Sequence, residues 1–442
     1  MTSTMFRALR LGCSVMLAWS AACTENKFDP LDPTSSTPAT EDPTITPATA
    51  VTAYRRHYVT PGGSSSGDGS LSRPWDLRSA LSGGKSIAPG DTVWVRGGTY
   101  RTSNLLSYVR GTSAARVVIR AYPGERATID GNLAVFGAYV TFWGLEVMNS
   151  NPVASGALGI NVKAPGSRFI NLIVHDAGAS GMGVWVEAPD AEVYGSLVYN
   201  NGTHPNLDHG IYTQNQTGLR RIRDNVIFNN WTYGLHAYSS TQGFLTNIEL
   251  DGNVSFNNGT TGTWGTAPDY LVGGVPASGI KVTNNLSYRR NDGETTARFG
   301  PGSNLTFAGN RFVGPVNILK WSSLTQTGNT LLSSSSPPTS GTKVVVRRNA
   351  YEAGRANVIV YDWSGQASVS ADLSGVLQVG TAYEVRNVQS FFGTPVAKGV
   401  YGGGAIQIPV TAVTPPRTIG RTANIAPSTG KAFNVFVVRR AS

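Results

Sequence analysis

The sequence predicts an all-β protein whose main part is a parallel β-helix, followed by a C-terminal β-sandwich. Two features of composition indicate β-structure: the 442 residues include 52 Gly, and only 14% of residues are charged. Glycine is unfavourable inside helices and well suited to turns, so this composition fits many short strands joined by turns. The third observation is an internal repeat, which indicates a solenoid. A hydrophobic content of 40% is sufficient for a buried core and argues against wholesale disorder.

The first residues are typical of a bacterial lipoprotein signal. Basic Arg7 and Arg10 precede a short apolar stretch, and small residues lead up to Cys23. We predict that residues 1–22 are removed and that Cys23 is lipidated, with an ordinary secretory signal as the alternative. Such an anchor holds a protein on a membrane surface without spanning it. The expected location is the cell envelope, at the outer membrane or cell surface, or outside the cell as a secreted protein.

A linker rich in Pro, Thr and Ser occupies residues 23–53, and the β-helix is expected over residues 54–350. Within that range, short β-prone segments recur at spacings of 25 to 32 residues, each beginning with Asn, Gly or Ser. A coil of this length with two or three short strands is typical of a parallel β-helix. Asn and Gly between the strands favour the left-handed backbone of tight corners. The segments are 144–147, 171–174, 196–199, 225–228, 253–256, 285–288 and 310–313.

Residues 72–81 predict a short helix with Ser72 as its N-cap, which would cover the N-terminal end of the solenoid. Around this helix, segments 58–63, 90–100 and 121–125 resemble the start of right-handed parallel β-helix proteins of the pectate-lyase-like superfamily. That superfamily includes polysaccharide lyases and glycoside hydrolases. The resemblance implies a right-handed solenoid that acts on carbohydrate.

The pattern changes at residue 351. Alternating strands are predicted at 358–363, 368–373, 383–387 and 433–438, which indicates a β-sandwich domain over residues 351–442. This domain resembles the C-terminal β-domains of carbohydrate-active enzymes. We expect it to carry no chemistry.

Polar and aromatic side chains gather on one outer face of the predicted solenoid. Equivalent positions on successive rungs stack about 4.8 Å apart. An alignment through the Gly-led strands places Trp185, Tyr212 and His236 in one column. It places Lys163, Glu187, Gln214 and Tyr238 in the next column. The candidate catalytic residues are His236, Tyr212, His209, Asp208 and Glu187, and the candidate substrate-binding residues are Lys163, Trp185, Gln214, Tyr238, Asp269 and Arg298.

Three functions fit these residues. In a β-elimination on a uronate glycan, His236 would be the base and Tyr212 the acid, with His209 or a nearby Arg neutralising the carboxylate. In a glycoside hydrolase, the paired carboxylates would come from Glu187, Asp208 and Asp269. The third function is surface glycan binding without catalysis. The favoured hypothesis is an exported, lipid-anchored polysaccharide lyase.

Charge and ligand spacing limit the partners. The formal net charge of +10 suits an anionic polysaccharide, with ordinary solvated surface charge as the alternative, and no basic stripe accompanies a nucleic-acid-binding motif. We expect a polysaccharide substrate, no nucleic acid, a membrane contact through the lipid only, and a monomer. No Cys–His cluster indicates zinc, and no acidic spacing matches a calcium loop. The sequence therefore identifies no certain cofactor and leaves the metal unknown. The resemblance leaves Ca²⁺ open, although Asp208-His209-Gly210 stands where an acidic pair would be expected.

Overall fold

A computed structural model describes residues 54–204, 207–239, 244–262, 267–274, 277–289 and 296–441. The predicted signal, the lipidation site Cys23 and the linker lie outside the described residues. One compact unit spans Ala53–Ser442 and includes both the β-helix and the C-terminal sheets. No helix in the described part of the chain has the length and apolar character needed to cross a membrane.

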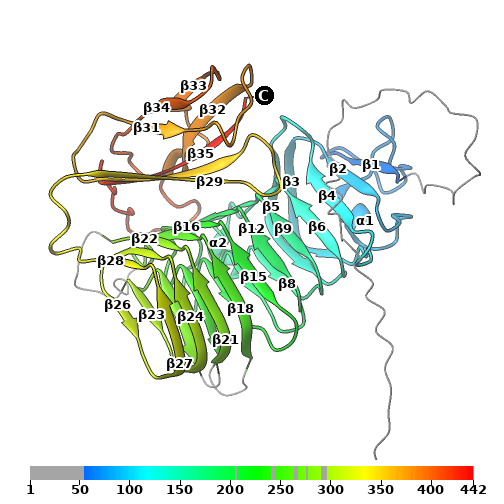
Figure 1. The fold of residues 1–442 in the computed structure, drawn as a ribbon. Coiled ribbons are helices and arrows are strands. Elements are labelled where there is room, and N and C mark those ends of the chain that lie inside the picture. Colours follow the sequence, from blue (N-terminus) through cyan, green and yellow to red (C-terminus); the bar gives the residue numbers. More distant parts are fainter. Residues whose placement is uncertain are drawn as a thin grey trace, which may run out of the picture. The chain divides into compact units, whose positions relative to one another are not determined.

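The main body is a right-handed parallel β-helix with three faces, as the sequence predicts. The first face is an 11-stranded parallel sheet whose strands lie side by side in chain order (Figure 1). Its strands are β1 (Arg56–Val59), β2 (Thr92–Val95), β4 (Val117–Ala121), β6 (Val140–Trp143), β9 (Arg168–Ile170), β12 (Glu192–Tyr194), β15 (Arg220–Arg223), β18 (Leu245–Asp251), β21 (Ala277–Thr283), β24 (Gly302–Ala308) and β27 (Trp321–Thr327).

The second and third faces are two series of short strands that the long strands β3 (Gly98–Ser107) and β5 (Ala127–Val135) join into one sheet. The second face contains β7 (Glu146–Met148), β10 (Ile173–His175), β13 (Leu197–Tyr199), β16 (Val226–Phe228), β19 (Val254–Phe256), β22 (Leu286–Tyr288), β25 (Arg311–Val313) and β28 (Thr330–Leu332). The third face contains β8 (Ile160–Val162), β11 (Met182–Val184), β14 (Ile211–Thr213), β17 (Leu235–Ser239), β20 (Tyr270–Gly274), β23 (Ala297–Phe299) and β26 (Val316–Ile318).

The repeated segments found in the sequence form the second face, and Asn residues turn the chain beside it. Asn229 and Asn257 have positive φ angles of 55° and 54°, as expected for the corners. Other asparagines stack inside the coil and donate side-chain hydrogen bonds from one rung to the next. In one such ladder, Nδ2 of Asn253 donates to Oδ1 of Asn285 at 3.0 Å, and Asn285 donates to Asn310 at 3.2 Å. These bonds satisfy buried polar groups at each turn and fix the stacking of rungs.

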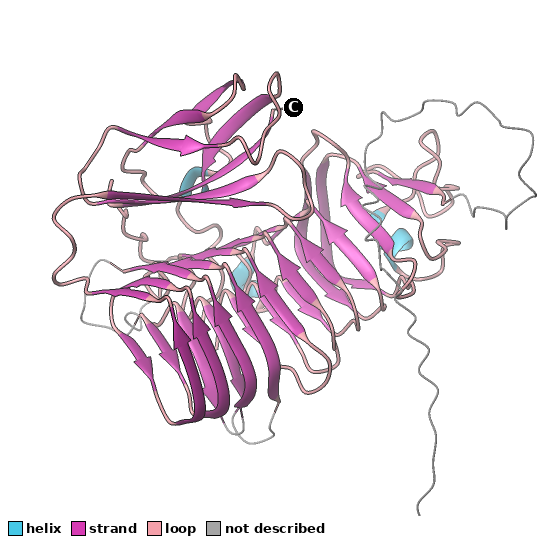
Figure 2. Ribbon diagram, viewed as in Figure 1, coloured by secondary structure: helices cyan, strands magenta, loops and turns pink. Residues whose placement is uncertain are grey.

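The N-terminal helix is shorter than predicted, and Ser72 is wrong as its N-cap. Helix α1 (Leu77–Leu81) is capped by Asp76, whose carboxylate accepts from the Ser79 N–H at 2.8 Å. The preceding Trp75 is instead held extended, because it bridges to Val59 of β1. Trp75 and Leu77 are nonetheless buried, as expected for residues that cover the first rung. Helices are otherwise limited to α2 (Pro152–Ser155) and the 3₁₀ turn η1 (Val388–Ser390) in the described chain (Figure 2).

Two antiparallel sheets follow the solenoid and contain all four predicted C-terminal strands. The five-stranded sheet has the order β29 (Thr342–Arg348), β30 (Ala356–Asp362), β35 (Phe433–Arg440), β32 (Ala382–Asn387) and β33 (Ala397–Val400). The second sheet pairs β31 (Ser368–Asp372) with β34 (Ala405–Pro409). The antiparallel part therefore begins before residue 351, because β29 pairs with β30.

The C-terminal sheets pack on the second face of the β-helix. A buried cluster joins Tyr199, Phe228 and Phe256 of that face to Tyr361 and Phe433 of the five-stranded sheet. The Tyr361 hydroxyl also donates to the Ser287 carbonyl at 3.0 Å. Phe228 and Phe256 stack with ring centroids 5.1 Å apart, so aromatic rungs continue into the interface. The candidate site belongs to the third face.

Candidate active site on the third face

The third face carries the candidate residues because its strands alternate between buried apolar and outward polar side chains. In β14 and β17, Ile211 and Leu235 point into the core, whereas Tyr212 and His236 point outward. The parallel register pairs Tyr212 with His236 directly. Gln214 and Tyr238, two residues later on the same rungs, lie in the next column. The predicted neighbours Tyr212, His236, Gln214 and Tyr238 are therefore brought together.

The predicted alignment of Trp185 and Glu187 is wrong by two residues. Gly183, not Trp185, pairs with Tyr212 on one side and Asn161 on the other. The indole of Trp185 nevertheless leans into the first column. Its Nε1 donates to Asn161 Oδ1 at 2.7 Å, and its ring centroid lies 5.4 Å from that of Tyr212. A Cβ at Gly183 would lie only 3.2 Å from this indole, so the missing side chain makes room for the ring.

Two histidines from adjacent rungs form the centre of the site. His236 Nδ1 lies 2.8 Å from His209 Nε2, and His209 Nδ1 lies 2.7 Å from the Thr232 hydroxyl. That hydroxyl donates to the Asp208 carbonyl. Burial lowers the pKa of His209 to about 3, and burial together with neighbouring His209 holds the pKa of His236 well below its ordinary value. Both imidazoles are therefore neutral at physiological pH.

The outer nitrogen of His236 is the unpartnered group of this pair. His236 is 7% exposed, and its buried Nε2 has no hydrogen-bond partner among the described residues. Tyrosines surround the ring, with the centroids of Tyr233, Tyr238 and Tyr212 at 4.7, 5.2 and 5.3 Å. A neutral nitrogen in a low-dielectric setting gains from accepting a hydrogen bond from a ligand, although burial makes it a weak base.

Tyr212 is held by its neighbours in the second column. Its hydroxyl donates to the Tyr238 carbonyl at 3.1 Å and accepts from Gln214 Nε2 at 2.9 Å. Burial raises the pKa of Tyr212, so the phenol stays protonated at neutral pH, although the hydrogen bond from Gln214 works against that shift. Tyr238 is 37% exposed and gives the site an accessible aromatic surface.

Tyr233 is a site residue that the sequence-based alignment missed. It precedes Gly234 as His209 precedes Gly210, and its ring lies 5.0 Å from that of His209. Burial raises the pKa of its phenol, and the positive charge of Arg298 opposes the shift. The residue immediately before each Gly-led strand is the sequence signal that would have identified Tyr233.

The cationic candidates lie at opposite ends of this surface. Arg298 is exposed on β23, two rungs from His236 through Leu271. Two rungs correspond to about 9.6 Å, within reach of a sugar ring bound between them. Lys163 Nζ lies 2.9 Å from Glu187 Oε1, and both side chains are well exposed. Such an exposed pair contributes little to stability and stays available to ligand.

A buried arginine inside the coil holds the backbone next to Trp185 and Gln214. Arg220 is fully buried, and its guanidinium donates to the carbonyls of Trp185 and Gln214 at 2.8 and 3.0 Å. It also donates to the Ala188 carbonyl at 2.7 Å. These bonds tie together the backbones of two neighbouring rungs where their side chains turn outward.

Two predicted carboxylates do not face a ligand. Asp269 is 0% exposed, accepts from Asn258 Nδ2 at 2.9 Å and lies 3.5 Å from Arg289 Nη2, so it cannot contact a glycan. Asp208 is buried, and its carboxylate accepts from the backbone N–H groups of Thr203 and His204 at 2.6 Å. The main-chain carbonyl of Asp208 is connected to the histidine pair through the Thr232 hydroxyl, whereas its carboxylate binds backbone N–H groups of the preceding loop.

The described residues do not form a calcium site. No group of three or more His, Cys, Asp or Glu side chains in the described part of the chain could hold a metal ion. Ca²⁺ prefers six to eight oxygen ligands, most from carboxylates and carbonyls. The carboxylate of Asp208 is already used by the loop, and Glu187 is paired with Lys163. The side chains beside His236 therefore do not fit the ion that the resemblance left open.

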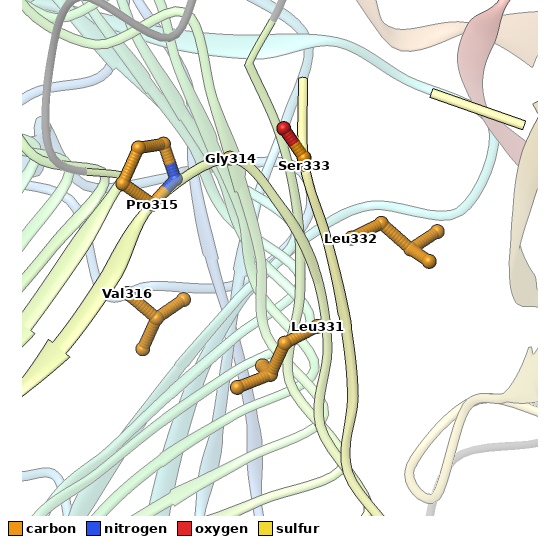
Figure 3. Close-up of a pocket in the computed structure, with 6 residues that line it drawn as sticks. All are labelled: Gly314, Pro315, Val316, Leu331, Leu332 and Ser333. Atoms are coloured by element: carbon orange, nitrogen blue, oxygen red, sulfur yellow. The ribbon is translucent and has the colours of Figure 1, made fainter. Parts of the chain in front are cut away.

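A separate pocket of about 300 Å³ lies at the last rungs of the β-helix (Figure 3). It is lined by Gly314, Pro315, Val316, Leu331, Leu332 and Ser333. Its lining contains no titratable side chain and lies at strands β26 and β28, far along the coil from β14 and β17. It offers no group for acid–base chemistry.

Comparison with known proteins supports the β-helix. Residues 57–267 match a family model described as a Pel9A-like, right-handed β-helix region. Pectate lyase L of Paenibacillus polymyxa (strain SC2) is 27% identical over 335 residues, which cover 67% of this chain and 73% of that protein. Pectate lyase PEL9 of Emericella nidulans is 41% identical over 75 residues, only 17% of this chain and 18% of that protein.

Several solved structures are similar to this chain at low sequence identity. The crystal structure of pectate lyase Pel9A has a TM-score of 0.47 at 19% identity, and the match covers 62% of this chain and 79% of that one. An alginate lyase from Paenibacillus sp. str. FPU-7 has a TM-score of 0.42 at 18% identity and covers 63% and 98%. The family match contains both histidines, Tyr212 and Tyr238 but ends before Asp269 and Arg298. The family model and the similarity to pectate lyase L confirm the resemblance to the right-handed parallel β-helix proteins of the pectate-lyase-like superfamily, so the β-helix is a polysaccharide-lyase-like scaffold.

Proposed function

We propose that this protein is a polysaccharide lyase that cleaves a uronate-containing glycan by β-elimination on the third face. The observation that carries the proposal is the buried, unpartnered Nε2 of neutral His236 among three tyrosines. In a uronate, the proton on C5 is acidified by the adjacent carboxylate, so a neutral base beside that carbon can remove it. The curated relatives named pectate lyases make a pectate-type polyuronate the first substrate to test.

The proposed step uses three side chains. In this proposal the substrate displaces the tyrosine side chains that cover His236, and His236 Nε2 then takes the C5 proton. The electron pair forms the C4–C5 double bond, and the C4–O bond to the next sugar breaks. Tyr212 gives its proton to the leaving oxygen, and Gln214 Nε2, which already donates to the phenol oxygen at 2.9 Å, stabilises the resulting phenolate. A proton then passes from His236 to Tyr212 through solvent, which restores both groups.

The carboxylate of the substrate needs a positive charge, and Arg298 supplies it in this proposal. His209 was the alternative in the sequence analysis, but it is neutral and both of its nitrogens are already engaged. Arg298 is exposed, and its charge acts on Tyr233 at the same site. A guanidinium can bind the carboxylate through two parallel hydrogen bonds and stabilise the charge that develops during proton removal.

Hydrolysis is less well supported by the described residues. It requires two carboxyl groups on either side of the scissile bond. Asp269 is enclosed and Asp208 is held by backbone N–H groups, so Glu187 is the one predicted carboxylate that is exposed. Pure glycan binding would use the same aromatic surface, and activity assays separate it from catalysis.

A panel of pectate, alginate and a neutral polysaccharide tests the function. A lyase produces an unsaturated sugar that absorbs in the far ultraviolet together with each new reducing end, a hydrolase produces the reducing end alone, and a binder produces neither. His236→Ala and Tyr212→Phe should abolish turnover while leaving the circular dichroism spectrum unchanged. His204→Ala, at an exposed histidine, and Tyr108→Phe, at an exposed tyrosine, are matched controls. Full activity in both site variants would refute the proposed centre.

The proposed setting is the cell envelope, with the mature chain attached through Cys23. A lipid anchor would hold the enzyme at the membrane while the β-helix contacts an external polysaccharide. Cys23→Ala should release the protein from the membrane fraction of a bacterial host without changing the activity of the purified β-helix. Retention of the variant in the membrane fraction would contradict this anchor.

A further inference from the structure

We propose that Thr232 and His209 are positioning residues that fix the tautomer of His236, so that its Nε2 carries a free lone pair. This inference rests on the proposed function for its catalytic meaning, but the tautomer itself is a property of the free protein. The four groups involved are Asp208, Thr232, His209 and His236, which lie in one continuous chain of hydrogen bonds.

The donor and acceptor of each hydrogen bond in this series follow from the bond at Asp208. The Asp208 carbonyl can only accept, so the Thr232 hydroxyl must donate its proton there. With its proton committed, the Thr232 oxygen is an acceptor toward His209 Nδ1, 2.7 Å away. His209 therefore carries its proton on Nδ1, and its Nε2 is a lone pair.

The position of the proton on His209 determines the position of the proton on His236 in the next rung. His209 Nε2 lies 2.8 Å from His236 Nδ1, so His236 must carry its proton on Nδ1 and donate it. A neutral imidazole has a single N–H, which leaves Nε2 of His236 unprotonated. That atom is the buried nitrogen for which the described part of the chain offers no hydrogen-bond partner. A main-chain carbonyl thus determines, through two side chains, which nitrogen of His236 is available as a base.

The series of hydrogen bonds fixes the position of the proton on each imidazole but does not transfer a proton away from His236. A carbonyl oxygen is not a base in water, so a proton taken up at His236 Nε2 stays on His236 until it leaves by the outer side. The protonated ring still donates from Nδ1 to His209 Nε2, so the chain keeps the same direction in both states of His236. Thr232 and His209 therefore act through His236 and do not touch the substrate.

Thr232→Val is the sharpest perturbation because it removes the hydroxyl at nearly constant volume. The His209 Nδ1–H would then face a methyl group, and a buried donor without an acceptor is unfavourable. Moving the proton to Nε2 of His209 relieves this, but it makes His236 Nδ1 an acceptor and puts the His236 proton on Nε2. We expect kcat to fall about ten- to a hundredfold with KM nearly unchanged, and Thr232→Ser to restore most of kcat.

Nitrogen NMR of ¹⁵N-histidine-labelled protein measures the tautomer without substrate. The chain has five histidines, so His209→Gln, His236→Ala and His204→Ala assign the relevant signals. The expected wild-type result is Nδ1–H on both His209 and His236 at neutral pH, reversed to Nε2–H in Thr232→Val. A proton on Nε2 of His236 in the wild type, or identical tautomers and kcat in Thr232→Val, would overturn the inference. If the tautomers are as expected but His236→Ala stays active, the proposed function fails and the tautomer assignment stands.

Discussion

Acid stability should depend on one buried carboxylate on the second face. Glu146 is 2% exposed and accepts from two nitrogens of Arg126 at 2.6 Å and from the Thr128 hydroxyl at 2.5 Å. Its Oε1 also lies 2.8 Å from His175 Nε2. Burial by itself would raise the pKa of Glu146, but the hydrogen bonds from His175, Arg126 and Thr128 outweigh it and lower that pKa to about 2.

The size and sign of the effect follow from this shift. The ordinary pKa is 4.5, and the folded value of about 2 corresponds to about 3 kcal/mol of stabilisation at neutral pH. Because the folded pKa is the lower one, the contribution is complete above pH 4.5 and is lost as the pH falls toward 2. Glu146→Gln removes it and should lower the free energy of unfolding by about 3 kcal/mol at pH 7, and by under about 1 kcal/mol near pH 2.5.

Urea denaturation at pH 7, 4.5 and 2.5 measures this difference, provided circular dichroism and tryptophan fluorescence give coincident transitions. Glu249→Gln is the matched control, because its carboxylate lies 3.9 Å from Arg223 at a partly exposed position of the first face. That control should change the free energy of unfolding by less than about 1 kcal/mol at each pH. A Glu146→Gln deficit that is the same at all three pH values would refute the electrostatic explanation and leave only lost packing.

Three further predictions concern the site and the ladder. Gly183→Ala should displace the Trp185 indole and raise KM about two- to tenfold with kcat unchanged, and an unaltered KM in steady-state kinetics would contradict this role. Asn285→Ala should lower the free energy of unfolding, measured by urea titration, by about 2–4 kcal/mol, because it leaves buried donors of the asparagine ladder unpaired. The control Asn329→Ala, at a partly buried position of the same ladder, should lower it by less than half as much. In pH profiles, kcat/KM should stay level from pH 7 to below 6.5, since burial and His209 depress the pKa of His236 in the free protein. The acid limb of kcat should lie at higher pH, because a bound carboxylate favours the imidazolium form of His236. If the acid limbs of kcat and kcat/KM coincide, no anion binds beside the base.

The coil could be predicted because its determinants are local and repeated. Each corner needs a left-handed residue, and Asn229 and Asn257 supply it at the same place on successive rungs. Each of the two directly follows a second-face strand, β16 or β19, so the repeat in the sequence marked that whole face. The start of helix α1 was missed because Trp75 pairs with β1, a contact between residues distant in sequence. The start of the antiparallel part depends in the same way on pairing of β29 with β30.

The register of one rung could not be predicted because a strand repeats every two residues. Gly181 and Gly183 both precede β-prone residues, and an alignment on either glycine keeps the same side chains pointing outward. The structure aligns Gly181 with Gly210 and Gly234, since the Gly181 N–H donates to the His209 carbonyl and the Gly210 N–H to the Tyr233 carbonyl. The backbone of Trp185 lies outside the first column, and only its side chain extends into that column. The alternation of residues along a strand does not predict the direction in which a large ring extends.

The functional meaning of Asp208 depends on which of its oxygens faces the histidines. A carboxylate at the inner end of the chain would attract positive charge, raise the pKa of the attached imidazole and strengthen it as a base. A carbonyl at that position fixes the tautomer but supplies no full negative charge, so His209 and His236 stay neutral. Under the proposed function, the charge that makes His236 a stronger base would have to arrive with the substrate, as a uronate carboxylate that lies near the ring as well as near Arg298. In the proposed mechanism, an anionic sugar would activate the base that removes its proton, and a neutral sugar of the same shape would meet an orientated but weakly basic nitrogen.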